Sequence, residues 1–226
     1  MTFTERAWER TAPIRAAIDE LPFIRALADG SLTGERFGYY LGQDALYLGQ
    51  YARVLAGAAA LATDPDELVF WAERARDAIV VERSLHAQHV DLAAGAAASP
   101  SCAAYTSFLL ARRFGEYGVL AAAVLPCFWI YQDVGASLLA VAGDPSAHPY
   151  GDWIGAYADP AFAEQTLRVR AIVDREAAAG GGPLRERMLA AYEQASRYEW
   201  MFWDAAWRME GWPVRGRTAQ PRRPVM

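Results

Sequence analysis

Apolar residues recur along this chain at spacings of three and four, which is the period of an amphipathic α-helix. Alternation of apolar and polar residues, the pattern of a half-buried strand, extends nowhere beyond a few residues. Proline and glycine stand mostly between the periodic segments, where they begin or end helices. The pattern predicts an all-α, single-domain helical bundle with no internal repeat.

Caps and breakers divide the chain into the helices that we expect. By residue number these are 5–19, 22–28, 33–62, 66–94, 99–114, 117–141, 150–157, 160–178 and 183–209. Thr4 is expected to cap the first helix, which Pro13 interrupts or kinks, and Pro126 lies inside the most apolar helix. The folded domain is expected to span residues 1–212, followed by a basic and disordered tail over 213–226.

Composition narrows the possible chemistry. All 22 basic residues are arginine, so a lysine Schiff base and a phosphate-loop lysine are excluded. The net charge is −5, and the arginines of the tail have no acidic neighbours, so the body is more acidic still. Nucleic acid is therefore not an expected partner. No apolar run reaches the ~20 residues that span a bilayer. With no export segment and two cysteines, we expect free thiols, a cytoplasmic location and no membrane partner.

Two carboxylates interrupt aromatic stripes. In helix 33–62 the stripe is Tyr40, Asp44, Tyr47 and Tyr51, at spacings of four, three and four. A buried carboxylate needs partners, so Asp44 either binds a ligand or bonds to a tyrosine or arginine within the core.

The second carboxylate lies in the last helix, where Glu199 shares a face with Tyr192 and Trp203, beside Phe202. Burial among rings should raise the pKa of Glu199 and make it a possible general acid. The alternative is a structural ion pair with Arg197 or Arg53.

Cys127 follows Pro126 within the most apolar helix, one turn before Tyr131. The proline leaves one backbone carbonyl without its helical partner and can open the helix toward a cavity. Free cysteines in such helices are commonly inert core residues, so the position alone leaves both a catalytic and a structural role open.

One cluster resembles metal ligands, namely Glu82, His86 and His89 at spacings of four and three. A helical di-metal site needs further inward carboxylates and a second histidine-bearing helix, which the sequence does not supply. We therefore expect Glu82 to orient His86 structurally, and we expect no metal site.

Several segments together resemble the TenA family, also called thiaminase II or aminopyrimidine aminohydrolase. They are Phe37-Gly-Tyr-Tyr-Leu-Gly-Gln-Asp44-Ala-Leu-Tyr47-Leu, Ala104-Tyr105-Thr-Ser107, Leu125-Pro-Cys127-Phe-Trp-Ile-Tyr131, Trp153-Ile-Gly-Ala-Tyr157, Tyr198-Glu199-Trp-Met-Phe202-Trp203 and Met209-Glu-Gly-Trp212. The resemblance runs from about Trp8 to Trp212.

This resemblance implies a heme-oxygenase-like fold, a homotetramer and no metal or organic cofactor. It also implies hydrolysis of an aminomethyl aminopyrimidine to 4-amino-5-hydroxymethyl-2-methylpyrimidine, a thiamin salvage reaction, and in many members cleavage of thiamin. By resemblance, Cys127 is the nucleophile and Glu199 the acid/base. The substrate-pocket positions that it implies are Asp44, Tyr47, Tyr105, Tyr131, Tyr157 and Phe202.

The chain departs from the common pattern at Phe128, where a tyrosine is frequent, and at Gln132-Asp133, which replaces an aromatic-Glu pair. These changes remove no catalytic group but leave open whether an amine or a thiazolium is the preferred leaving group. Two other functions stay open at this point. One is a metal-dependent oxidase of the same fold, and the other is a non-catalytic pyrimidine-binding regulator.

Overall fold

A computed structural model of the protein describes residues 1–89 and 97–214, with side chains for residues 1–80 and 97–214. Within these ranges the regular secondary structure is helical, which confirms the predicted fold class. The helices are α1 (Phe3–Arg10), α2 (Ala12–Asp19), α3 (Pro22–Ala28), α4 (Gly34–Leu61), α5 (Pro65–His89), α6 (Pro100–Arg112), α7 (Tyr117–Ala142), the 3₁₀ helix η1 (Pro145–Ala147), α8 (Gly151–Ala158), α9 (Pro160–Ala179) and α10 (Gly182–Arg208).

Most helix starts follow from local capping chemistry. Thr33 caps α4 by accepting a hydrogen bond from the backbone N–H of Arg36, and Ser99 caps α6 in the same way. Asp159 caps α9, where Pro160 occupies the first turn and its missing N–H costs nothing. These starts agree with those expected from the sequence.

The N-terminal segment shows the expected interruption near Pro13, but Thr4 is not the helix cap that the sequence predicted. Thr2 is the cap, in a capping box with Glu5. The chain breaks at Thr11, after which Pro13 lies in the first turn of a separate helix, α2. Thr4 is instead buried, and its hydroxyl donates to Asp174 on α9 at 2.9 Å. A tertiary contact therefore decides its role.

The apolar helix α7 is the centre of the bundle and packs against α10, α9, α8 and α6. It is long and apolar enough to cross a membrane, but 78% of its most apolar window is buried inside the fold. The helix continues through Pro126 without a break. Its apolarity on all sides is that of a core helix.

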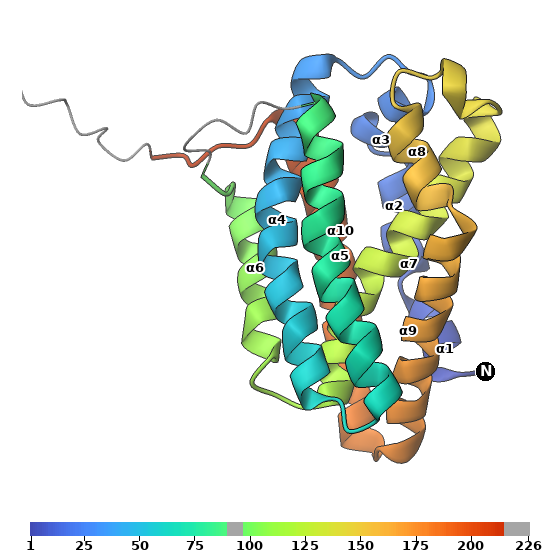
Figure 1. Ribbon diagram of the computed structural model, residues 1–226, viewed down its shortest axis with the longest axis vertical. Helices are drawn as coiled ribbons and strands as arrows, with labels where there is room; N and C mark the ends of the chain where they lie inside the picture. The colour runs from blue at the N-terminus through green and yellow to red at the C-terminus, as the bar shows by residue number, and fades with distance from the viewer. Residues whose placement is uncertain (90–96, 215–226) are drawn as a thin grey trace, which may run out of the picture.

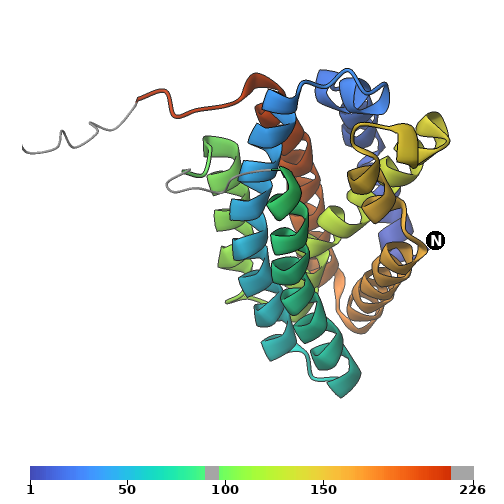
Figure 2. The same cartoon turned by 45° about the horizontal axis from the view of Figure 1, so that its top comes forward.

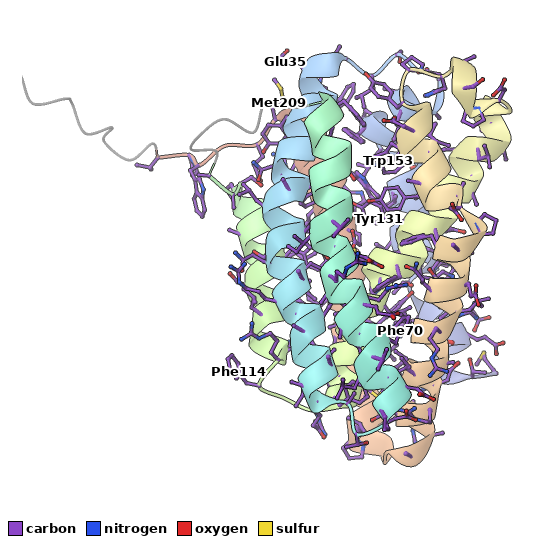
Figure 3. All side chains as sticks on the ribbon, in the orientation of Figure 1. Glu35, Phe70, Phe114, Tyr131, Trp153 and Met209 are labelled. Carbon is purple, nitrogen blue, oxygen red and sulfur yellow. The ribbon has the colours of Figure 1, made fainter. Side chains whose placement is uncertain are left out.

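The remaining helices surround α7 in two groups (Figure 1). The antiparallel pair α4 and α5 lies on one side, with α6 beside α4, while α1, α8 and α9 lie on the other side; the turned view agrees (Figure 2). Tyr131 and Trp153 fill the interior between these groups (Figure 3). The two groups thus form the walls of the space in which the candidate site lies.

Some predictions fall outside the described residues. The side chains of Glu82, His86 and His89 are among them, as are the last residues of the helix expected to end at Ala94. The tail is described only as far as Val214. The short helix η1 was not expected, and it forms because Asp144 accepts a hydrogen bond from the backbone N–H of Ser146.

Candidate active site

A cavity of about 350 Å³ opens between α4 and α5 on one side and α7, α8 and α9 on the other. This volume is at the lower end of the roughly 300–1,000 Å³ typical of small-molecule sites. Its lining is mostly apolar, with four charged or amide side chains. The lining residues are Leu48, Tyr51, Leu55, Arg74, Asp77, Ala78, Cys127, Phe128, Ala156, Tyr157, Asp159, Ala161, Phe162 and Gln165.

Cys127 brings a thiol to the wall of this cavity from the middle of α7. It is partly exposed, whereas Cys102 is fully buried at 1% exposure and lines no part of the cavity. Burial raises the pKa of the Cys127 thiol well above its usual value, and the nearby Glu199 charge raises it further. The hydroxyls of Tyr47 and Tyr51 act in the opposite direction, because they can donate to a thiolate.

Glu199 is buried at 1% exposure on α10. The Tyr105 hydroxyl donates a hydrogen bond to Glu199 Oε1 at 2.5 Å. Burial raises the pKa of Glu199 to about 8, the charge of Asp44 adds to the rise, and the Tyr105 bond opposes it. The expected rise is confirmed, and the carboxyl is largely protonated at neutral pH. Neither alternative ion pair forms, since Arg197 bonds to Glu193 and Arg53 to the carbonyl of Gly49.

An aromatic cluster surrounds the two acids. The ring of Tyr47 lies 5.0 Å from that of Tyr105 and 5.7 Å from that of Phe202, measured between centroids. Tyr131 and Tyr157 are 4.8 Å apart. Asp44 is buried, at 5% exposure. It lies close enough to this cluster that its charge raises the pKa of Glu199 and of Cys127.

Close contact between two helices positions Tyr157. A Cβ atom at Gly135 of α7 would lie 2.7 Å from the backbone and Cβ of Tyr157 on α8. Only glycine allows the helices to approach this closely, so Gly135 lets Tyr157 stand at the cavity wall.

The structure therefore brings all eight predicted site residues into one region. Cys127 and Tyr157 line the cavity. The other six lie behind that wall as a buried layer, joined by ring contacts, the Tyr105–Glu199 hydrogen bond and the charge of Asp44. They are Asp44, Tyr47, Tyr105, Tyr131, Glu199 and Phe202.

The sequence profile of the TENA/THI-4/PQQC family matches residues 8–209, nearly the whole chain. The chain belongs to this family.

Relatives in the TENA/THI-4/PQQC family are similar over most of this chain. "Aminopyrimidine aminohydrolase" of Bacillus subtilis is 33% identical over 84% of this chain and 84% of its own length. The protein of the same name from Halalkalibacterium halodurans is 33% identical over 96% of this chain and 100% of its own. "Thiamine biosynthesis multifunctional protein ThiED" of Corynebacterium efficiens is 42% identical over 93% of this chain, but the chain spans only 29% of that relative.

Solved structures support the family's fold. The "TenA homologue protein from P.horikoshii OT3" aligns with a TM-score of 0.81 at 27% identity, over 92% of this chain and 99% of the other. A domain described as having a heme oxygenase-like fold, from Shewanella denitrificans, aligns with a TM-score of 0.72 over 92% of this chain and 93% of the other, at 14% identity. The heme-oxygenase-like fold expected from the resemblance is confirmed.

Sequence reasoning missed several residues of the site in this family member. Tyr40 links the cluster to α8, since its hydroxyl donates to Tyr131 and accepts from the Trp153 indole, both at 3.3 Å. Tyr51 lines the cavity and donates to the carbonyl of Val124 at 2.9 Å. Both tyrosines belong to the stripe of Asp44, so their spacing was the available signal.

Arg74 and Asp77 gave no such signal. Three residues apart on a helix, they have the pattern of an ordinary surface ion pair.

Over residues 1–80 and 97–214, no three His, Cys, Asp or Glu side chains are grouped as ligands for a metal ion.

Proposed function

We propose that the chain is a hydrolase that cleaves a C–N bond in thiamin salvage, releasing 4-amino-5-hydroxymethyl-2-methylpyrimidine from an aminomethyl aminopyrimidine. The names of relatives that align along most of this chain support the activity. One observation carries the proposal. The Cys127 thiol faces a cavity of small-molecule size, and a carboxyl with a pKa of about 8, that of Glu199, lies in the layer behind it.

In the first proposed step Cys127 Sγ bonds to the electron-poor ring carbon beside a ring nitrogen. Because the thiol is protonated at rest, its proton passes to that nitrogen as the S–C bond forms. The ring loses its aromaticity, and its electrons then expel the amine from the exocyclic methylene. Glu199 gives a proton to the leaving nitrogen, so that ammonia departs and the carboxyl becomes a carboxylate.

The second step reverses the addition with water in place of ammonia. The Glu199 carboxylate takes a proton from water as the oxygen bonds to the methylene. The S–C bond then breaks, the ring nitrogen returns its proton to sulfur, and aromaticity is restored. The sum is one water consumed and one ammonia released, with Cys127 and Glu199 unchanged.

The other predicted residues hold the ring. Asp44 is proposed to accept hydrogen bonds from the amidine-like edge of the pyrimidine. The rings of Tyr47, Tyr105, Tyr131, Tyr157 and Phe202 are proposed to provide flat surfaces for stacking. Burial raises the pKa of Tyr47, Tyr105, Tyr131 and Tyr157 well above that of a free phenol, so their hydroxyls remain donors.

The proposal needs no metal and no organic cofactor, because the thiol and the two carboxyls supply each bond-making and proton-transfer step. A small pyrimidine is the proposed partner, with no nucleic acid or membrane. The homotetramer and the cytoplasmic location expected from the sequence remain predictions. The oligomeric state is measured directly by light scattering after size exclusion.

The test compares the two cysteines. Cys127→Ser should lower ammonia release from the aminopyrimidine by at least roughly 10³-fold. Cys102→Ser is the matched control, because Cys102 is fully buried, its pKa is raised to about 12 and it lines no part of the cavity. Equal losses in both variants would remove Cys127 from the mechanism. Tight pyrimidine binding by a wild type that releases no ammonia would favour the non-catalytic regulator.

A further inference from the structure

Three hydrogen-bonding side chains from three helices form a chain that ends at Tyr131. The indole N–H of Trp153 on α8 donates to the hydroxyl of Tyr40 on α4, and that hydroxyl donates to Tyr131 on α7, both at 3.3 Å. The first member sets the direction of the chain, because an indole nitrogen donates but does not accept. Since the Tyr40 proton lies between the two phenol oxygens, the Tyr131 proton points away from Tyr40.

The packing of the core holds Tyr40 in one place. Its side chain is fully buried. Its ring centroid lies 5.3 Å from that of Phe23, 6.2 Å from that of Trp153 and 6.0 Å from that of Phe202. Burial raises the pKa of the Tyr40 hydroxyl well above that of a free phenol, and the charge of Asp44 raises it further. The centre of the chain is therefore a fixed hydroxyl that keeps its proton.

The chain ends beside the Asp44 carboxylate. Tyr40 precedes Asp44 by four residues on α4, so the two side chains lie one turn apart on the same face of that helix. The charge of Asp44 also raises the pKa of Tyr131, as expected for neighbouring groups. An acceptor, the Asp44 carboxylate, and a donor, the Tyr131 hydroxyl, therefore lie on the same side of the site.

We propose that Tyr40 and Trp153 are positioning residues that fix the Tyr131 hydroxyl as a donor toward the bound ring. With Asp44 as the acceptor, this donor matches the edge of a 4-aminopyrimidine, where an amine stands beside a ring nitrogen that accepts. A 4-oxopyrimidine presents the reverse pattern, a carbonyl beside a ring N–H, and leaves both groups of the site unpaired. The inference rests on the proposed function and names the residues that select an amino over an oxo pyrimidine.

The test is the preference for the amino compound, measured on the full chain as a ratio of two dissociation constants. The ligands are 4-amino-5-hydroxymethyl-2-methylpyrimidine and its 4-oxo counterpart. Tyr40→Phe lets the Tyr131 hydroxyl turn and accept from a ring N–H, so the preference should fall roughly tenfold. The loss should lie in binding of the amino compound, while the oxo compound binds no worse than to wild type. Equal weakening of both ligands would indicate a packing defect and overturn the inference.

Tyr150→Phe is the matched control. Tyr150 is also a buried tyrosine, but its hydroxyl donates to the backbone carbonyl of Leu32. Its variant should keep the wild-type preference. If Tyr150→Phe lowers the preference as much as Tyr40→Phe does, the loss of any buried hydroxyl has that effect, and the inference is overturned.

A double variant tests whether Tyr40 acts through Tyr131. Tyr131→Phe should lower the preference about as much as Tyr40→Phe, because it removes the donor itself. Adding Tyr40→Phe to Tyr131→Phe should then change the preference no further, since two residues that act through one contact are not additive. Losses that add up would overturn the inference.

The head of the chain has its own variant. Trp153→Phe removes the donor that sets the direction but leaves Tyr40 able to donate to Tyr131. The preference should therefore fall by a smaller factor than in Tyr40→Phe. A wild-type preference in this variant would overturn the inference, because the direction of the chain depends on the indole.

The outcomes separate the inference from the proposed function. A wild type that releases no ammonia from the aminomethyl aminopyrimidine and does not bind the product contradicts the proposed function itself. A wild type that does both, but binds the amino and oxo compounds equally well, overturns the inference alone.

Discussion

The hydroxyl of Tyr105 donates a hydrogen bond to Glu199 Oε1 at 2.5 Å, in a part of the core where both side chains are 1% exposed. This bond links α6 to α10 across the bundle. The bond also stabilises the ionised form of Glu199 and so lowers its pKa, whereas burial favours the neutral form and raises the pKa. The pair therefore sets the pH at which the carboxyl can give up a proton.

Removal of that bond should shift the pH dependence of turnover. A general acid acts in its protonated form, so kcat for the aminomethyl substrate should fall as pH rises through about 8, the pKa of Glu199. Tyr105→Phe removes a contact that lowers this pKa, so the alkaline limb should move to higher pH. Tyr39→Phe is the control, since Tyr39 bonds to the Glu210 carbonyl away from the site. A limb that moves to lower pH would contradict the acid role.

The same carboxyl should make stability depend on pH. The pKa of Glu199 is about 8 in the folded protein against 4.5 ordinarily, so the folded state holds a proton that the unfolded state releases. Its contribution is fully favourable below about pH 4.5 and is lost as pH rises through 8. Glu199→Gln should remove this slope, giving a variant more stable than wild type at pH 8 and little changed at pH 4.5. Denaturant titrations across this range measure the difference, and parallel curves would refute it.

Asp44 and Glu199 should respond differently to amide substitution. Asp44→Asn should weaken binding of both substrate and product, because it exchanges an acceptor for a donor at the pyrimidine edge. Glu199→Gln should cut turnover while product affinity stays close to wild type. The difference in turnover between the two variants should be largest with the aminomethyl substrate, since a thiazolium departs without a proton. The measurements are product dissociation constants and turnover numbers. Lost product binding with retained turnover in Glu199→Gln would assign that residue to binding.

The contact between α7 and α8 should be sensitive to a single methyl group. Gly135→Ala puts a Cβ 2.7 Å from Tyr157, which should cost about 1–3 kcal/mol of unfolding free energy. The forced separation should also displace Tyr157 and lower activity. Gly155→Ala lies on α8 with no atom within 4 Å of its Cβ, so it should be neutral or stabilising by about 0.5–1 kcal/mol. Equal stabilities for the two variants would show that α7 and α8 separate freely.

The sequence by itself determined most of the helices and one face of the site. Caps such as Thr33 and Ser99 act on backbone groups within one turn, so local residues fix where those helices begin. The stripe of Asp44 and Tyr47 was visible because residues three and four apart share one helix face. The resemblance to the TenA family predicted the fold and the eight site residues. The family match and the structural comparison confirmed the fold.

Only the tertiary structure decided which groups meet. Thr2 caps α1 through a capping box with Glu5, while Thr4, the expected cap, bonds to Asp174 of α9, a partner 170 residues away. The Glu199 carboxyl found Tyr105 of α6 in place of an arginine. The Arg74–Asp77 pair looked like solvated surface until the fold placed α5 across the cavity from α7 and α9. Helix periodicity fixes the face on which a side chain lies, whereas the packing of helices distant in sequence determines its partners, its burial and hence its pKa.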